Sequence, residues 1–308
     1  MQRRNILVAS VLAFIVLAGA GWWWKRNHLA GIPLASDEEF YEPSDPGYGR
    51  DGIVFEVLIP DGPRLQAFLR RQAGEPLVAT GLDGKLVGLL ADGLERSENL
   101  RHWRIHLKPG IQRQDGGPVD SAWLQEALRN LDGGPFAGAD PALPKAPDAR
   151  TLLLDFKEGR DLLPDLSGED RLLFTSSGGQ PVGTGPFQIQ VREGAPGLSR
   201  FLGFRHGKAG FTGLRVATDP TLMESHRWSS DMVAGRYAFS VFPGQVDPDD
   251  MARVRTLPYQ EVHFRDGTVW FVSTRLRRFR TDQQDWTRIH LFSMWLGDTL
   301  MPLELKRP

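Results

Sequence analysis

The sequence predicts an α/β fold, because strand-like alternation and helix-like spacing follow one another along the chain. Residues 101–107 alternate between apolar and polar side chains, as a half-buried strand does. Residues 123–131 repeat apolar side chains at helical spacing. Asp120 precedes them, where its carboxylate can accept hydrogen bonds from the free amides of a first helical turn. We therefore predict a strand hairpin followed by a capped helix within residues 86–131.

The rest of the chain continues this alternation. Asp219-Pro220 combines a capping residue with proline, which favours a helix start, and Gly235 is placed to end that helix near Ala234. Residues 132–148 are dense in glycine, proline and alanine, which predicts a long loop. The other elements expected are a helix after residue 63, helices at 161–166 and 282–295, and strands at 53–59, 77–80, 151–156, 182–191, 199–204, 214–218, 237–242 and 269–274.

The composition excludes several classes of protein. The chain has 308 residues, of which 41% are hydrophobic, and this is enough for a sizeable core. Its formal net charge of -1 gives no reason to expect nucleic acid as a partner. The chain contains no cysteine. Disulfides, thiolate metal sites, cysteine nucleophiles and a lipid-modified N-terminal cysteine are therefore excluded.

The N-terminal segment predicts a membrane anchor. Residues 1–5 are basic, and residues 6–24 form an uncharged apolar run close to the roughly 20 residues that cross a bilayer as a helix. Three tryptophans end this run, which suits a membrane interface. The alternative is a cleavable signal peptide, since residues 17–20 offer small side chains. Residues 25–50 carry prolines, glycines and acidic residues, which predicts a solvated linker before a domain at 51–308.

Two ordered sets of motifs carry a resemblance to a known family. The first set comprises Gly84-Lys85-Leu86 with Leu90-Ala91, the strand that ends at Lys108-Pro109-Gly110, the turn Gln114-Asp115-Gly116-Gly117-Pro118 and the helix opening Asp120-Ser121-Ala122-Trp123. The second is Val182-Gly183-Thr184-Gly185-Pro186-Phe187. In this order they resemble the family 5 extracellular solute-binding proteins of ABC transporters, the oligopeptide, dipeptide and nickel binders.

The resemblance implies a fold and a location. The fold is a periplasmic-binding-protein-like (type II) mixed-sheet lobe, with the second lobe largely missing, preceded by one N-terminal transmembrane helix. The location is the bacterial inner membrane, with residues 1–5 in the cytoplasm and the domain facing the periplasm or the extracellular side.

The resemblance also implies a function. The first hypothesis is ABC-type uptake of a peptide or similar small solute, with an ABC permease or a second protein that completes the cleft as partner. The alternative is a non-transporting scaffold or interaction protein of the cell envelope. By position, the implied ligand-facing residues are Leu77, Val78, Thr80, Gly183, Thr184, Trp270 and Ser273.

The sequence carries no convincing motif for metal binding, catalysis or phosphate binding. His102 and His106 are four residues apart, but on a strand they lie too far apart to chelate one metal together, so neither a metal nor another cofactor is expected. No G-x-S-x-G motif exists and no catalytic residues are predicted, so we expect a protein that is not an enzyme. The glycines around Thr184 do not predict a phosphate loop, because Pro186 removes an amide that a phosphate would need.

The C-terminal part offers two further surfaces. The arginines within 275–280 favour a solvated strand end over a site for an acidic partner or lipid. Trp286 and Trp295 are expected to lie in the core. If the second lobe is missing, they are expected to mark a protein–protein surface.

Overall fold

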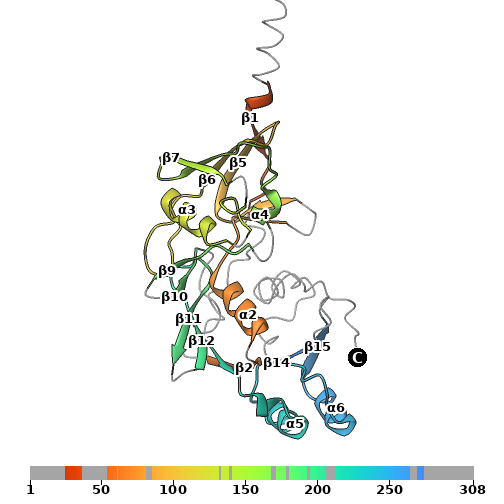
Figure 1. Ribbon diagram of the computed structural model, residues 1–308. Coiled ribbons are helices and arrows are strands. Elements are labelled where there is room, and N and C mark those ends of the chain that lie inside the picture. Colours follow the sequence, from red (N-terminus) through yellow and green to blue (C-terminus); the bar gives the residue numbers. More distant parts are fainter. Residues whose placement is uncertain are drawn as a thin grey trace, which may run out of the picture. The chain divides into compact units, whose positions relative to one another are not determined.

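The computed structural model describes residues 25–36, 54–60, 62–80, 85–131, 133–138, 141–167, 171–177, 180–192, 195–205, 213–263 and 269–273. These residues form two compact units, and Figure 1 labels many of their elements. Unit 1 combines the chain up to Ala35 with residues 76–110 and 119–171. Unit 2 combines residues 36–75 and 111–118 with the chain from Leu172 onward. Each unit is therefore assembled from separated segments of the chain.

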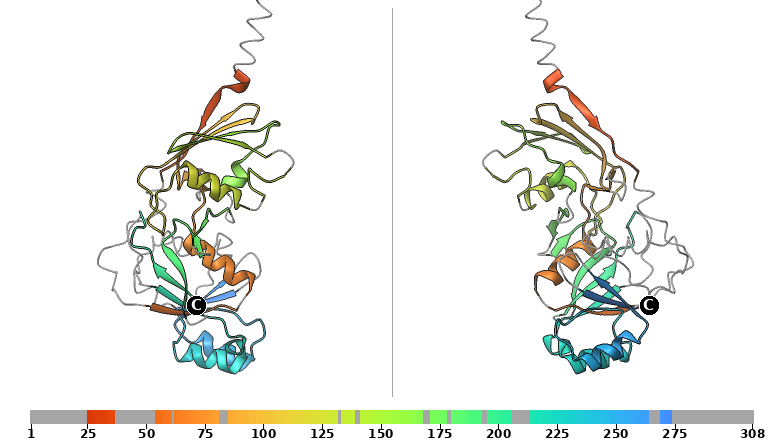
Figure 2. Two further views of the ribbon diagram at one scale, coloured as in Figure 1. Left: turned by 60° about the vertical axis from the view of Figure 1, so that its left-hand side comes forward. Right: turned by 90° about the vertical axis from the view of Figure 1, so that its right-hand side faces the viewer.

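Unit 1 is built on a five-stranded antiparallel sheet in the order β1-β5-β6-β8-β7. Helix α3 (Ser121–Arg129) covers one face of this sheet, as Figure 2 shows. A two-stranded sheet and a short helix, α4 (Leu163–Ser167), complete the unit. The strands are β1 (Leu29–Ile32), β5 (Ala91–Ser97), β6 (His102–Leu107), β7 (Leu143–Asp148) and β8 (Thr151–Asp155) in the large sheet, and β3 (Val78–Thr80) and β4 (Leu86–Gly88) in the small one.

The local patterns in the sequence explain the core of unit 1. Trp103 and Ile105 of β6 are buried against the helix side, while the residues between them are half-buried on the other face. The carboxylate of Asp120 accepts a hydrogen bond from the backbone nitrogen of Trp123 at 2.8 Å and so caps α3. The predicted hairpin and capped helix are both confirmed.

Unit 2 is built on a seven-stranded mixed sheet in the order β11-β12-β13-β2-β14-β16-β15. The central strand, β2 (Val54–Leu58), runs parallel to β13 (Gly213–Ala217) and β14 (Phe239–Val241). The outer strands pair antiparallel, and β9 with β10 forms a separate hairpin. These strands are β9 (Thr175–Ser177), β10 (Gln180–Val182), β11 (Phe187–Arg192), β12 (Ala195–Arg200), β15 (Tyr259–His263) and β16 (Val269–Ser273).

Helices cover both faces of the unit 2 sheet, and Figure 2 shows them on opposite sides. On one face, α2 (Pro63–Ala73) packs Phe68 and Leu69 against a cluster that includes Val57 of β2. On the other face, α5 (Ser225–Val233) and α6 (Pro248–Arg255) pack against a cluster that includes Leu58 of β2. Successive side chains of β2 thus enter different layers of the core, because a strand alternates its faces. The α/β fold with a mixed sheet is confirmed.

The structure corrects two expectations about irregular segments. Residues 29–32, expected in a solvated linker, form β1 and pair with β5. Residues 143–148, expected in a loop, form the edge strand β7. Pro144 and Pro147 lie in β7, and proline is tolerated there because an edge strand leaves one row of backbone amides unpaired.

Two further boundaries differ from expectation. The strand expected at 199–204 is β12, which ends at Arg200. The helix expected from Asp219 is divided, because Glu224 is extended between a short 3-10 helix, η1 (Pro220–Met223), and α5. Gly235 does follow the C-cap Ala234 with a positive φ of 67°, as predicted.

Several expectations lie outside the described residues. These are the apolar run at 6–24, the arginines at 275–280, and the helix at 282–295 with Trp286 and Trp295. Within the described ranges, no helix combines the length and apolar character needed to cross a membrane.

Candidate functional site

The two sequence motifs meet in unit 2 around the side chain of Gln114. Its Nε2 donates hydrogen bonds to the carbonyl oxygens of Ala73 (2.9 Å), Gly185 (3.1 Å) and Phe187 (2.6 Å). Its Oε1 accepts a hydrogen bond from the backbone nitrogen of Gly183 at 3.1 Å. Acceptors surround the nitrogen and a donor faces the oxygen, so the amide can point only one way. The side chain is buried, and it ties the end of α2 to the start of β11.

Close backbone approach explains the glycines of the second motif. A Cβ at Gly183 would lie 2.3 Å from the carbonyl oxygen of Ala73. A Cβ at Gly185 would lie 2.7 Å from the carbonyl oxygen of Gln72. Thr184 between them is 1% exposed, and its Oγ1 has no hydrogen-bond partner in the described part of the chain. The motif is therefore a packing junction at the end of α2.

The ligand-facing residues implied by the resemblance are divided between the two units. In unit 1, Leu77 and Val78 are fully buried and Thr80 is exposed at the end of β3. In unit 2, Trp270 of β16 is buried in the core and Ser273 ends the same strand. Gly183 and Thr184 are buried in the junction around Gln114. Within unit 2 this junction lies at the C-terminal end of α2, whereas the ring of Trp270 lies against Phe68 in the same helix.

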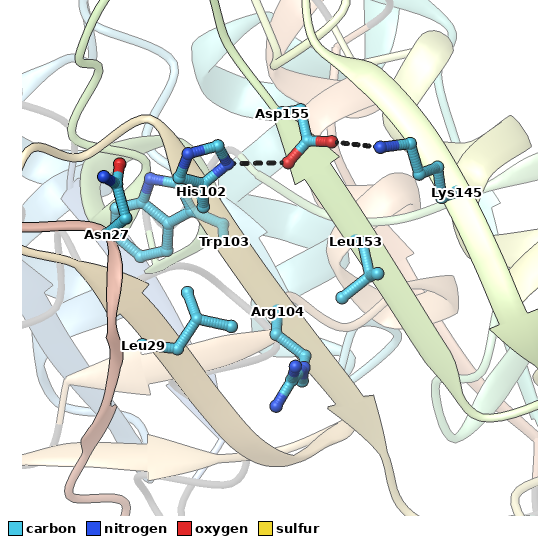
Figure 3. A pocket seen from close by; sticks show the side chains of 8 residues that line it. All are labelled: Asn27, Leu29, His102, Trp103, Arg104, Lys145, Leu153 and Asp155. Carbon is cyan, nitrogen blue, oxygen red and sulfur yellow. Dashed lines mark hydrogen bonds and ion pairs between the residues drawn. The ribbon is translucent and has the colours of Figure 1, made fainter. Parts of the chain in front are cut away.

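A groove that the sequence did not predict opens on the sheet of unit 1. Its volume is about 410 Å³, and Figure 3 shows it from close by. It lies on the face that carries His102, Arg104, Leu153 and Asp155, the side chains that alternate with the buried ones on β6 and β8. Its lining comprises Asn27, Leu29, His102, Trp103, Arg104, Lys145, Leu153 and Asp155.

Asp155 is the electrostatic centre of the groove. It accepts a hydrogen bond from Lys145 Nζ at 2.7 Å, and its other oxygen lies 2.9 Å from His102 Nδ1 (Figure 3). Partial burial alone would raise the pKa of this carboxyl, but the hydrogen bonds from His102 and Lys145 hold the pKa below its usual value. The carboxylate therefore stays charged and fixes both neighbours.

A second set of ion pairs lies beside the first. Arg104 Nη1 lies 2.8 Å from Glu95 Oε2, and His106 Nε2 lies 3.7 Å from Glu95 Oε1. Both histidines of β6 therefore have an acidic neighbour, which no local motif revealed because the partners come from other strands. In the described ranges, no three His, Asp or Glu side chains are grouped as metal ligands would be.

No protein-family model and no curated protein matches the sequence. Solved structures match the fold. The ABC transporter substrate-binding protein CtaP from Listeria monocytogenes is 16% identical with a TM-score of 0.52, over 70% of this chain and 51% of that one. DppA from Helicobacter pylori, an ABC transporter-associated periplasmic binding protein in complex with peptide STSA, is 13% identical with a TM-score of 0.52, over 70% and 51%.

A nickel ABC transporter protein from Bacillus halodurans is 18% identical with a TM-score of 0.51, over 68% of this chain and 49% of that one. The chain has the fold of ABC-transporter substrate-binding proteins. It spans about half the length of the solved structures it matches.

Proposed function

We propose that this protein is a membrane-anchored, extracytoplasmic solute-binding protein for ABC-type uptake of a peptide or similar small solute. The observation that supports the proposal is the fold, which is shared with substrate-binding proteins over about 70% of the chain. In this proposal residues 6–24 cross the inner membrane once, residues 1–5 lie in the cytoplasm, and the folded units within 25–308 face outward. The protein binds its ligand without transforming it, and an ABC permease is its partner.

The proposed ligand contacts are those that the resemblance implies. Thr80 is exposed and offers a hydroxyl group, while Gly183 and Thr184 are buried in the junction around Gln114. Leu77, Val78 and Trp270 are buried, and Ser273 lies at a strand end.

The test is thermal denaturation of the full chain in detergent micelles with di- to nonapeptides, free amino acids and nickel–histidine complexes. A ligand that binds only the folded state stabilises it by about 2.7 kcal/mol at a hundredfold excess over its dissociation constant. We expect peptides to raise the midpoint, and Thr80→Ala to weaken the effect. A cooperative melt that no ligand class shifts would contradict the solute-binding proposal.

The second candidate is a scaffold or interaction protein of the cell envelope. The burial of Leu77, Val78 and Trp270 favours it, because these side chains do not line an open surface. Co-purification after cross-linking in membranes separates the two. A permease among the cross-linked proteins supports uptake, whereas envelope proteins without a permease support the scaffold.

A further inference from the structure

The chain is fastened to unit 1 directly after its N-terminal apolar run. The carbonyl oxygen of Arg26 accepts a hydrogen bond from the backbone nitrogen of Asn99 at 3.4 Å. The side-chain oxygen of Asn27 accepts one from Asn99 Nδ2 at 2.9 Å. Strand β1 then begins at Leu29, opposite Ser97 at the end of β5. The residues expected to form a solvated linker therefore start as part of the sheet.

The β5–β6 turn that receives the chain is itself tightly held. Asn99 Oδ1 accepts hydrogen bonds from Ser97 Oγ at 2.6 Å and from the backbone nitrogen of Arg101 at 3.1 Å. The carbonyl oxygen of Leu100 accepts a hydrogen bond from the backbone nitrogen of Arg160 at 3.1 Å. The turn and the loop at 156–160 thus form one end of unit 1. We call residues 25–28, 98–101 and 156–160 the tether end.

The tether end begins only a few residues after Trp24, so the two must lie close together. Only Lys25 and Arg26 separate Trp24 from Asn27. An extended chain spans at most about 3.6 Å per residue, so Asn27 lies within about 11 Å of Trp24. Residues 25–27 are helical, which shortens the rise to about 1.5 Å per residue. The polar layer on each side of a bilayer core is roughly 5 to 8 Å thick, so Asn27 lies in or close to this layer when Trp24 ends the proposed membrane span.

The charge of the tether end suits anionic lipid. Its exposed basic side chains are Lys25, Arg26, Arg101 and Lys157, against exposed Glu98 and Glu158. Arg160 of the tether end lies 2.6 Å from Asp165, outside this end. At the headgroups this surplus of positive charge would lie within a Debye length of the lipid phosphates, about 8 to 10 Å at physiological salt, and would therefore be poorly screened.

We infer that the tether end of unit 1 rests on the headgroups of the membrane, with its basic side chains against anionic phospholipid. The inference depends on the anchoring of residues 6–24 in the proposed function. Unit 1 is then held at the bilayer surface by the hydrogen bonds of Asn99 and by charge, and no flexible spacer separates β1 from the anchor.

Fluorescence quenching by lipid tests the inference. The chain has no cysteine, so Arg101→Cys, Lys157→Cys and Asp92→Cys each carry one fluorophore. Asp92 is the matched control, because it is exposed and lies near the other end of β5, about 17 Å from Ser97 at roughly 3.4 Å per residue. The full chain is placed in vesicles of phosphatidylcholine and phosphatidylglycerol, with and without a spin label on the lipid headgroup.

We expect the headgroup label to quench the probes at 101 and 157 at least threefold more than the probe at 92. A Lys25→Glu, Arg26→Glu variant should lose part of that difference in anionic vesicles but not in pure phosphatidylcholine. Equal weak quenching at all three positions, in protein that floats with the vesicles, would overturn the inference and leave the anchor intact. Protein that does not float would overturn the anchor itself, and the inference with it.

Discussion

The backbone nitrogen of Gln114 donates a hydrogen bond to the carbonyl oxygen of Gly183 at 3.0 Å, and the side-chain oxygen of Gln114 accepts one from the nitrogen of the same glycine at 3.1 Å. The two residues are 69 positions apart and belong to separate motifs. Gln114 therefore joins the two motifs in one junction, which connects the end of α2 to the start of β11.

The charge of the side chain at 114 should decide the stability of this junction. Gln114→Ala removes the donor to three carbonyl oxygens and should cost about 1 to 3 kcal/mol. Gln114→Glu has the same shape but directs a carboxylate at those oxygens, and should cost about 3 to 5 kcal/mol at pH 7. Chemical unfolding of the full chain in micelles measures both values.

The cost of Gln114→Glu should also depend on pH. The carbonyl oxygens disfavour the charged form, so the folded-state pKa of this glutamate would lie above its unfolded value of about 4.3. The variant then recovers stability below that unfolded pKa and loses it as the pH rises through the folded pKa. A pH-independent loss no larger than that of Gln114→Ala would show that the carbonyl oxygens do not repel a carboxylate at this position.

The glycines at 183 and 185 should not tolerate a methyl group. Alanine at either position places its Cβ within 2.7 Å of backbone atoms in α2, which cannot move as a flexible side chain can. Each substitution should lower the free energy of unfolding by about 1 to 3 kcal/mol. Gly31→Ala is the control, because a Cβ there would meet nothing within 4 Å. Losses equal to that of the control would contradict the packing argument.

Acid should weaken the contact between α5 and α6 through Asp250. Its carboxylate is buried and accepts hydrogen bonds from Ser225 Oγ and Ser229 Oγ, each at 2.7 Å. These bonds hold the pKa of Asp250 below its ordinary value of 3.8. The stability that they supply is complete above 3.8 and is lost as the pH falls through the lower folded-state pKa.

Unfolding in urea between pH 2 and 5 measures this effect. Asp250→Asn should flatten the decline in stability at the acid end, while Asp249→Asn, an exposed neighbour in the same helix, should leave it unchanged. His226 Nδ1 at 2.6 Å and Arg253 at 3.9 Å also face Asp250, and both side chains are kept unchanged in the two variants. Identical acid profiles for the two variants would exclude Asp250 as the source.

A buried ion pair should make the end of α2 sensitive to the loss of one partner. Glu75 Oε2 lies 2.6 Å from Arg205 Nη1, with side chains 4% and 16% exposed. Arg205→Met leaves a buried carboxylate without this cation and should cost about 3 to 5 kcal/mol. Replacing both residues by methionine should cost less than Arg205→Met alone. Asp92→Ala removes an exposed pair with Arg150 and, as the control, should cost about 1 kcal/mol or less.

Sequence patterns predicted the elements whose own residues alternate regularly between the core and the surface. The alternation of β6 and the cap at Asp120 were sufficient, because Trp103 and Ile105 enter the core in strict order. The edge strands β1 and β7 carry no such alternation, since their residues are mostly exposed and their pairing partners determine them. Helix α6 has a capping aspartate at Asp247 and proline after it, but it buries only Asp250 and Val254, so no apolar stripe revealed it.

The contacts of the candidate site could not be predicted in the same way. Gln114 and its carbonyl partners are separated by up to 73 positions, and His102 and Asp155 by 53. A motif indicates that a glycine or a glutamine matters, but the identity of its partner depends on how distant strands pair. The sequence motifs therefore contained the residues of the junction, whereas no pattern indicated the groove of unit 1.

The interleaving of the two units has a consequence for biosynthesis. Unit 1 is complete once Arg171 has been made. The central strand β2 is made earlier, yet both of its neighbours, β13 and β14, are made after unit 1 has ended. Until then β2 has neither of its neighbouring strands, so the apolar side chains of Val57 and Leu58 are not covered by the sheet and its helices. Because unpaired apolar strands aggregate, we expect this segment to be the one that a chaperone shields until translation has passed residue 241.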